Sequence, residues 1–303
     1  MSKPLVISTD FPYESKFVDV RGAKMHYIEQ GEGPTILFLH GIPTSSYLWR
    51  NVIPEVAPYG RCIALDLIGL GKSDKPDIDY RVFDHIDYVT DFIDALGLKD
   101  ITLVMQGWGS VIGFSYARAH EKNIKALAFI EGQIRPPVHW NMLPFRIELI
   151  NALLSQPDAK DKIMNTDYYI DQVMREGIMR PLSEEELSFY KQPFQNAESR
   201  KPIWQFLKDL PKNHTDKNTP GESDDVLQLI TDYSTWLQKT SIPKLMLYGT
   251  PGFDTPILDV VQWAAEHLPH LKQVYLGEIL HYPQEFIPQV LGACIGSWSY
   301  QQR

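Results

Sequence analysis

The sequence predicts an α/β fold in which a mostly parallel central sheet is flanked by helices and carries an inserted helical cap. Short apolar runs of strand length alternate with stretches of helical spacing along most of the 303 residues, which is typical of a parallel sheet covered on both faces. One segment, residues 133–240, breaks this alternation with many prolines and is too long for a plain loop. We therefore expect a core domain of residues 1–132 and 241–303, and a helical cap with its linker at residues 133–240.

The strands are predicted from apolar runs that are bounded by turn residues. The first two runs flank Arg21-Gly22-Ala23 and are expected to form a β-hairpin. In chain order, the predicted strands are Lys16–Val20, Lys24–Glu29, Thr35–Leu39, Arg61–Asp66, Ile101–Met105, Ala126–Ile130, Lys244–Tyr248 and Gln273–Leu276.

The helices are predicted where apolar residues recur every three or four positions. Between Val82 and Leu96 the apolar residues follow this spacing, and Gly97 comes next as a C-terminal stop. Ser110–Ala119 and a last segment, Phe286–Ser299, are also expected to be helical. A polar stretch, Asn213–Asp225, is interpreted as an exposed linker within or beyond the cap.

Charge and cysteine content exclude several classes of protein. With 29 Lys+Arg against 38 Asp+Glu, the formal net charge of −9 argues against a nucleic-acid or membrane-surface partner. Cys62 and Cys294 are too few for a disulfide framework or a metal site and are interpreted as core thiols. No signal-peptide core and no apolar run of membrane-spanning length is found, so a cytoplasmic location is expected. A monomer or weak homodimer is expected as well. No metal or organic cofactor is implied.

The stretch Leu103–Ser110 (LVMQGWGS) joins a predicted strand to a predicted helix. Gly109 permits a sharp turn there, and the helix N-terminus adds positive potential. This is the setting of a nucleophile elbow, G-x-nucleophile-x-G, although Met105 occupies the first glycine position. In α/β-hydrolases, the loop that here begins at His40-Gly41 supplies one backbone N–H of an oxyanion hole, and the residue after the nucleophile, here Trp108, supplies the other.

His281 is the candidate general base. It lies in the loop Gly277–Glu285, between the last predicted strand and the final helix. The order nucleophile, acid, histidine along the chain is that of the α/β-hydrolase fold. The position of His281 in the predicted topology therefore favours a catalytic role over a structural one.

The chain resembles the haloalkane dehalogenase family of α/β-hydrolases, particularly the branch that also contains a coelenterazine-type luciferase. The resemblance spans nearly the whole length and implies hydrolysis of carbon–halogen bonds in small haloalkanes. It rests on eight motifs: HGIPTSSYLWRNVIP at 40–54, ALDLIGLGKSDKP at 64–76, GWGSVIGF at 107–114, AFIEGQIRPP at 128–137, MRPLSEEELSFYKQPF at 179–194, ESRKPIWQF at 198–206, PKLMLYGTPG at 243–252 and LHYPQE at 280–285.

The resemblance implies a five-part site. Gly107 stands at the position of the family's Asp nucleophile, and His281 matches the base. Glu131 matches the acid that orients the histidine in this branch. Trp108 matches a tryptophan that grips the departing halide, and Ile42 stands where the family has a halide-binding Asn.

Two parts of the site are less determined. Asp254, after the next strand, is the alternative acid, because acids occur at that position across the wider fold. The side chains expected to line the pocket are Trp140, Phe145, Met174, Leu207, Leu280 and Ile279.

Three positions depart from the family around one predicted pocket. Gly107 has no side chain to attack carbon, so displacement of halide by a carboxylate is not possible at this position. Ile42 replaces half of the halide cradle by hydrocarbon, and Ile279 stands where the family more often has a small residue. Either the sequence has been engineered, or the chain has moved to another chemistry.

Three functions remain after these departures. The first is a haloalkane dehalogenase-like hydrolase, nucleophile-dead or engineered, whose native activity is lost or very low. The second is a general-base catalyst of proton abstraction or elimination by His281 and Glu131, with the backbone N–H groups of Ile42 and Trp108 facing a developing anion. The third is a non-catalytic scaffold that binds a small apolar ligand, halogenated or aromatic.

Overall fold

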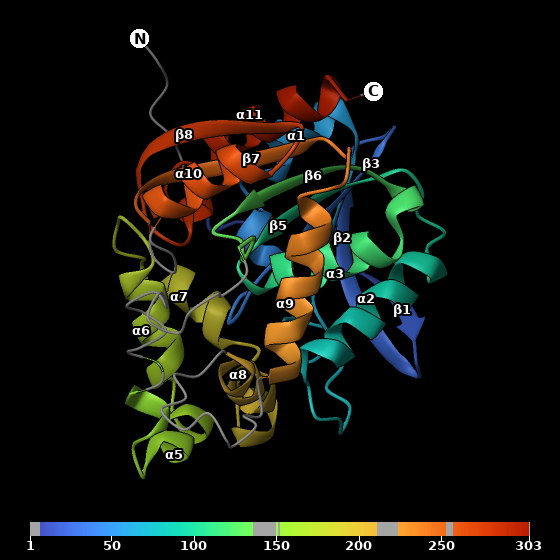
Figure 1. Cartoon of the computed structure of the whole chain (residues 1–303). Coiled ribbons are helices and arrows are strands. Elements are labelled where there is room, and N and C mark those ends of the chain that lie inside the picture. Colours follow the sequence, from blue (N-terminus) through green and yellow to red (C-terminus); the bar gives the residue numbers. More distant parts are fainter. Residues whose placement is uncertain (1–6, 136–149, 151, 211–223, 253–256, 303) are drawn as a thin grey trace.

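An eight-stranded sheet forms the centre of the molecule (Figure 1). The computed structural model describes residues 7–135, 150, 152–210, 224–252 and 257–302. The strand order is β1-β2-β4-β3-β5-β6-β7-β8, with antiparallel pairing of β1 to β2 and of β2 to β4, and parallel pairing elsewhere. The strands are β1 (Lys16–Val20), β2 (Ala23–Gln30), β3 (Thr35–Leu39), β4 (Arg61–Leu65), β5 (Ile101–Gln106), β6 (Ile124–Ile130), β7 (Lys244–Pro251) and β8 (Leu271–Ile279).

Helices cover both faces of the sheet, and further helices form a separate group at one end of it (Figure 1). The described α-helices are α1 (Ile53–Val56), α2 (Val82–Ala95), α3 (Trp108–Ala119), α5 (Ala159–Asn165), α6 (Tyr168–Glu176), α7 (Glu184–Lys191), α8 (Ala197–Asp209), α9 (Asp224–Leu237), α10 (Ile257–His267) and α11 (Pro288–Tyr300). Single 3-10 turns are η1 (Ser46–Trp49), η2 (Ala57–Tyr59), η3 (Glu121–Asn123) and η5 (Pro283–Glu285). The predicted fold class and the eight predicted strands are confirmed.

Alternating side chains of the strands divide the core in two. On β3, Ile36 and Phe38 belong to the cluster packed against α1 and α11, while Leu37 and Leu39 belong to the cluster that holds α2, α3 and α10. Successive side chains of a strand point to opposite faces, so an unbroken apolar run such as TILFL fits a strand buried on both sides.

The helix α2 begins and ends as its sequence predicts. Asp84 in its first turn accepts a hydrogen bond from the backbone N–H of Arg81, the residue that precedes the helix. Its buried positions recur at helical spacing and face β1 and α3. Gly97 follows with φ of 61°, a left-handed conformation that glycine adopts at little cost.

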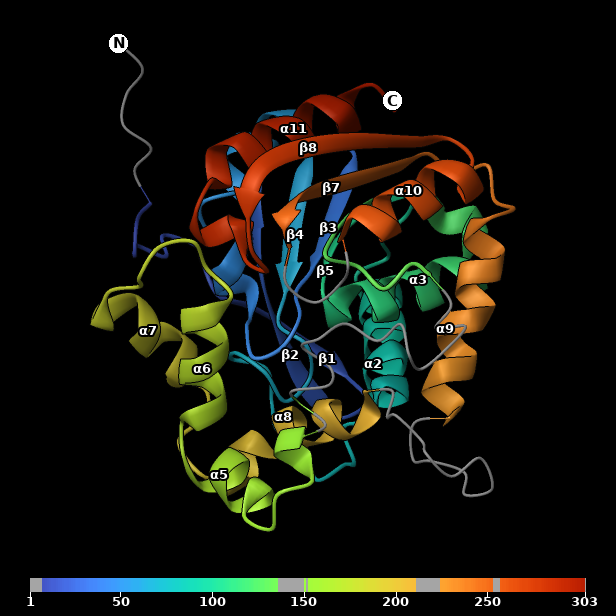
Figure 2. The ribbon, with the colours of Figure 1, turned by 60° about the vertical axis from the view of Figure 1, so that its left-hand side comes forward.

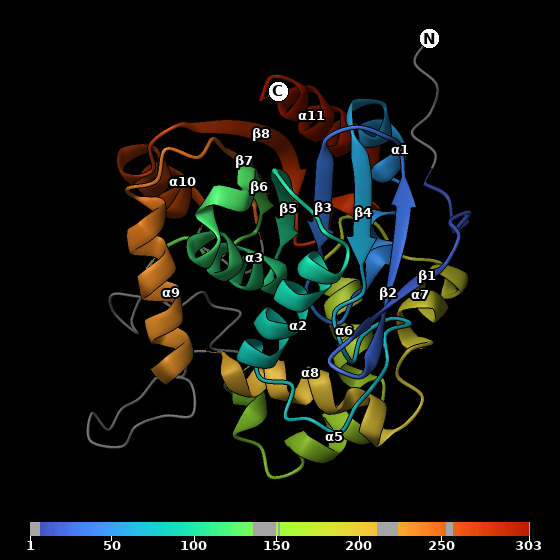
Figure 3. The ribbon, with the colours of Figure 1, turned by 90° about the vertical axis from the view of Figure 1, so that its right-hand side faces the viewer.

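Helices α5–α8 lie beyond the carboxyl ends of the parallel strands (Figure 3). Helix α9 runs beside α3 instead (Figure 2), so the last helix of the predicted cap segment covers the sheet domain. The division into a core and a cap at residues 133–240 stays a prediction. Within the described residues of that segment, all regular structure is helical.

Other expectations concern cysteines and membrane spans. Cys62 is buried in the sheet core, whereas Cys294 on α11 is only half-buried, so the interpretation as core thiols fits the first better than the second. No helix in the described part of the chain has the length and apolarity that crossing a membrane requires.

Candidate active site

The turn between β5 and α3 places Gly107 at the carboxyl edge of the sheet. Strand β5 is buried along its whole length, and the helix starts directly after the turn, at Trp108. Gly107 has φ of 52° and ψ of −127°, a conformation that a residue with a Cβ adopts only under strain. The N–H of Trp108 is the first of the helix and has no acceptor within it, so positive potential is directed to this turn.

The loop after β3 lies directly against this turn. A Cβ on Gly109 would come within 2.4 Å of the carbonyl oxygen of Leu39. A Cβ on Gly41 would lie 3.3 Å from the backbone nitrogen of Trp108. The backbones of the two segments therefore pack directly on each other. This brings Ile42 close to Trp108, and the backbone N–H groups of these two residues are the predicted oxyanion donors. The side chain of Ile42 is buried.

His40 holds the loop after β3 in place. Its Nδ1 lies 2.7 Å from the carbonyl oxygen of Gly41, and its Nε2 accepts a 3.0 Å hydrogen bond from the N–H of Leu67. The accepting Nε2 fixes the proton on Nδ1. Complete burial lowers the pKa of His40, although the nearby Asp66 carboxylate opposes the shift. His40 is thus a neutral structural residue.

His281 lies above the turn, in the loop between β8 and α11. A Cβ built on Gly107 would lie 3.3 Å from Nε2 and 3.5 Å from Cε1 of His281. A side chain at position 107 would therefore point at the imidazole. The imidazole is almost fully buried.

Glu131 faces the opposite side of the His281 ring. It directly follows β6, is 4% exposed and has a positive φ of 48°. Its Oε2 lies 3.7 Å from Nδ1 of His281, close enough for charge interaction but longer than a hydrogen bond. Three predicted positions, 107, 131 and 281, thus meet at one edge of the sheet although they lie on separate segments.

Tyr282 ties the loop of His281 to two other segments. Its hydroxyl donates to the carbonyl oxygen of Ile42 at 2.9 Å, and its backbone N–H donates to the carbonyl oxygen of Gly177 at 2.9 Å. The His281 and Tyr282 rings meet edge to face, with centroids 4.6 Å apart. The imidazole is therefore held between the core and the segment after α6.

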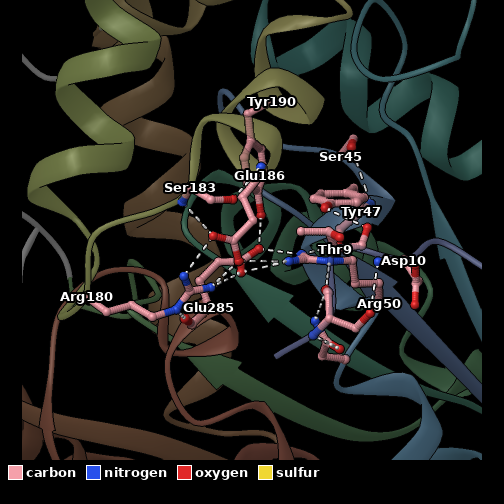
Figure 4. A network of polar contacts seen from close by, with 12 residues as sticks. Thr9, Asp10, Ser45, Tyr47, Arg50, Arg180, Ser183, Glu186, Tyr190 and Glu285 are labelled. Atoms are coloured by element: carbon pink, nitrogen blue, oxygen red, sulfur yellow. Dashed lines mark hydrogen bonds and ion pairs between the residues drawn. The ribbon is translucent and has the colours of Figure 1, made fainter. Parts of the chain in front are cut away.

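A buried ionic network extends this connection (Figure 4). Arg50, which follows η1, forms a two-pronged ion pair with Glu285, and both side chains are 0% exposed. Burial disfavours the charge of Arg50, but the Glu285 carboxylate outweighs it and raises the pKa of Arg50. Tyr190 of α7 also donates to Glu285, and Arg180 bridges Glu186 and Glu285. The network joins η1, the loop of His281 and the helices of the predicted cap.

An aromatic stack links the turn to α8. The ring of Trp108 lies 5.1 Å from that of Phe206, and Phe206 stacks on His85 of α2 at 4.4 Å with an interplanar angle of 22°. Helix α8 therefore contacts both the turn at Trp108 and the core helix α2.

The remaining predicted site residues occupy different places. Met174 on α6 and Leu207 on α8 are buried in the apolar cluster that also contains Ile42, and Leu280 is half-buried beside His281. Ile279 is buried at the end of β8 and packs on Gly249 of β7. Three predicted residues lie outside the described residues: Trp140, Phe145 and Asp254. The choice between Glu131 and Asp254 as the acid thus stays open.

Sequence reasoning missed Gln106, Tyr282 and the ionic network. Gln106 left a signal, because it is a polar residue at the end of a wholly buried strand, directly before the turn. Arg50 and Glu285 were also visible in the sequence. Each is a charged residue within a largely uncharged motif, HGIPTSSYLWRNVIP for Arg50 and LHYPQE for Glu285.

Comparisons with known proteins identify the family of this chain. The family described as the alpha/beta hydrolase fold matches residues 34–285. A haloalkane dehalogenase from Mesorhizobium japonicum is 38% identical over 288 residues, covering 93% of this chain and 89% of that protein. One from Sphingobium indicum is 37% identical, covering 94% and 95%.

Solved structures give the same result. The haloalkane dehalogenase DbeA from Bradyrhizobium elkani superposes with a TM-score of 0.88 at 36% identity, covering 95% of this chain and 98% of that one. DatA from Agrobacterium tumefaciens superposes with a TM-score of 0.86 at 29% identity, covering 97% and 99%. Similarity of this extent in both sequence and structure means that the chain belongs to the haloalkane dehalogenase family of α/β hydrolases.

Proposed function

We propose that this chain is a haloalkane dehalogenase-family protein whose nucleophile is missing, so that hydrolysis of carbon–halogen bonds in small haloalkanes is lost or very low. The observation that carries the proposal is the direction of the Cα–Cβ bond at Gly107, which would point at Nε2 of His281 from 3.3 Å. This is the position from which a nucleophile could attack a bound substrate and form a covalent ester. The imidazole would then assist the second step, in which water hydrolyses that ester. Glycine offers only backbone there.

The residue at the predicted halide-binding position supports the same proposal. Halide that leaves carbon needs hydrogen-bond donors or another positive group around it. Ile42 contributes a branched hydrocarbon, which leaves only its backbone N–H and the groups of Trp108. A chain with both changes lacks the attacking group and part of the cradle for the leaving group.

A second candidate, general-base catalysis, is favoured by the contacts of His281. Glu131 faces Nδ1 at 3.7 Å and the Gln106 amide nitrogen lies 2.8 Å from Nε2. The Glu131 carboxylate favours a positive charge on the ring, whereas the Gln106 amide must turn its N–H away before Nε2 can take a proton from a substrate or a water molecule. Proton abstraction or elimination is a reaction class that needs no attacking side chain at position 107.

The test compares halide release from 1-bromobutane and 1,2-dibromoethane by the parent protein and by Gly107→Asp, Ile42→Asn and the double variant. We expect the parent at the buffer rate and the double variant well above it. Adding His281→Ala to the double variant is the control, because an alkyl ester should then accumulate at position 107 and appear as a mass increase. Halide release by the parent above the buffer rate, or an adduct on another side chain, would contradict the proposal.

The alternatives have their own signatures. A general base predicts elimination by the parent protein that disappears in His281→Ala. A non-catalytic binder, the third candidate, predicts thermal stabilisation by small halogenated or aromatic ligands without turnover. Measurement of mass in solution tests the expected monomer or weak homodimer.

A further inference from the structure

Gln106 makes two contacts with His281. Its side chain is fully buried at the end of β5. Its amide nitrogen lies 2.8 Å from Nε2 of His281 and 3.3 Å from the carbonyl oxygen of the same residue. One amide group thus faces both the ring and the backbone of the candidate base.

The carbonyl oxygen of His281 fixes which way the amide points. A carbonyl oxygen only accepts hydrogen bonds, so it selects the amide nitrogen of Gln106 as its neighbour. With the amide turned over, Oε1 would face this carbonyl oxygen and two acceptors would meet. The orientation with nitrogen toward His281 is therefore the favoured one, which is the argument that assigns amide groups in hydrogen-bond networks.

The amide orientation determines which ring nitrogen of His281 carries the proton. Because an N–H of Gln106 points at Nε2, that nitrogen presents its lone pair, and the proton of the neutral ring lies on Nδ1. Nδ1 faces Glu131 Oε2 at 3.7 Å, where a proton is favoured beside a carboxylate. The opposite tautomer would place donor against donor at Gln106 and lone pair against carboxylate at Glu131.

We infer that Gln106 is a positioning residue that sets the tautomer of His281, with the lone pair on Nε2 and the proton on Nδ1. This deepens the proposed general-base function and rests on it for its catalytic meaning. Nε2 is also the ring nitrogen nearest to the Cβ direction of Gly107. The lone pair is therefore on the ring nitrogen that lies next to the turn at Gly107.

The Gln106 amide can reorient when His281 is protonated. When Nε2 takes up a proton it becomes a donor, and the amide N–H no longer fits it. Oε1 of Gln106 is buried and has no hydrogen-bond partner among the described residues. Turning the amide over would let Oε1 accept from the protonated Nε2, at the expense of the contact with the His281 carbonyl.

The experiment is nitrogen NMR of protein labelled with 15N-histidine near neutral pH, with the His281 signals assigned from their loss in His281→Ala. We expect a protonated Nδ1 and an unprotonated Nε2 in the parent. Gln106→Leu should shift the tautomer ratio about fivefold toward protonated Nε2, the worth of one net hydrogen bond. Gln106→Glu should place a proton on Nε2, because a carboxylate there accepts.

Thr102→Val is the matched control, since Thr102 is a buried polar residue of the same strand. It should leave the His281 signals as in the parent. A proton on Nε2 in the parent would overturn the inference even if no Gln106 variant folds, and so would an unchanged tautomer in folded Gln106→Leu. The measurement uses no substrate, so its outcome is independent of whether the general-base function itself is correct.

Discussion

The hydroxyl of Tyr282 donates a 2.9 Å hydrogen bond to the carbonyl oxygen of Ile42. Through it, the loop of His281 is attached to the loop after β3, which lies against the turn at Gly107. Tyr282 is 1% exposed and Ile42 is 5% exposed, so both partners of this hydrogen bond are buried. The relative position of imidazole and turn therefore depends on this contact.

Tyr282→Phe should lower the free energy of unfolding by about 1–3 kcal/mol, because it leaves the buried carbonyl of Ile42 unpaired. Tyr275→Phe is the control: its hydroxyl also has a partner, Thr250 at 2.8 Å, but Tyr275 is 54% exposed. We expect that variant to stay within about 0.5 kcal/mol of the parent. Urea denaturation measures the free energy of unfolding of both variants, provided that their m-values stay unchanged. Equal losses of unfolding free energy in the two variants would contradict the role of Tyr282.

Glu285→Leu should cost about 3–5 kcal/mol of unfolding free energy, since it removes the carboxylate nearest to the buried charge of Arg50 and leaves only Glu186, 3.9 Å away. Combining it with Arg50→Met should cost less than the sum of the two single changes, because the double variant removes both charges. A double-mutant cycle measures this coupling. Additive losses would mean that the two groups do not interact.

An exposed ion pair serves as the control for that cycle. Arg175 and Glu184 lie 3.8 Å apart with side chains 63% and 88% exposed. Their cycle should give a coupling close to zero, because water screens an exposed pair. Comparable coupling in both cycles would show that burial is not what strengthens the network of Glu285.

The fold followed from the sequence because its signals are local. The run TILFL on β3 and the spacing in α2 each identify an element without knowledge of its neighbours. The positions of Gly107 and His281 followed from topology, since parallel strands bring their carboxyl ends to one edge. Glu131 was indicated by the resemblance to the family. Element ends were less predictable: β8 extends from Leu271 to Ile279, well beyond the four residues, Gln273–Leu276, that indicated it.

Contacts between distant side chains left no such signal. Tyr282 and Ile42 are 240 residues apart, and Arg50 and Glu285 are 235 apart. A single sequence contains nothing that pairs one such residue with the other. Gln106 was missed for a different reason, since its polarity was visible but its role depends on where the loop of His281 passes.

Protonation of His85 should make the protein less stable in acid. Burial, and to a smaller extent the nearby His40, lowers the pKa of His85 to about 3 in the folded state. Between about pH 6.5, the ordinary value for an unfolded chain, and that value, the unfolded state binds a proton that the folded state does not. The contribution of His85 to stability is therefore present above this window and falls by about 1.4 kcal/mol per pH unit within it.

His85→Phe should remove that part of the pH dependence while keeping the stack on Phe206. Phe92→Leu is the control on the same helix, since it removes buried apolar volume without changing a titrating group. It should lower stability at every pH and keep the slope of the parent. Unfolding free energies measured by urea between pH 7 and pH 4 decide the matter, and an unchanged slope in His85→Phe would refute the assignment.

Gly107→Ala tests whether His281 really lies over the bare turn. Gly97→Ala is its control, because Gly97 also has a positive φ, 61°, but a Cβ there would meet nothing within 4 Å. We expect about 1–2 kcal/mol of lost stability at Gly97 from the backbone alone. The loss at Gly107 should be larger for two reasons: ψ of −127° lies outside the left-handed helical region, and the new methyl group would crowd Nε2 at 3.3 Å. A loss at Gly107 no greater than at Gly97 would mean that neither the strained backbone nor the nearby imidazole is present at this turn, and the argument for a missing nucleophile at this position would lose its geometric basis.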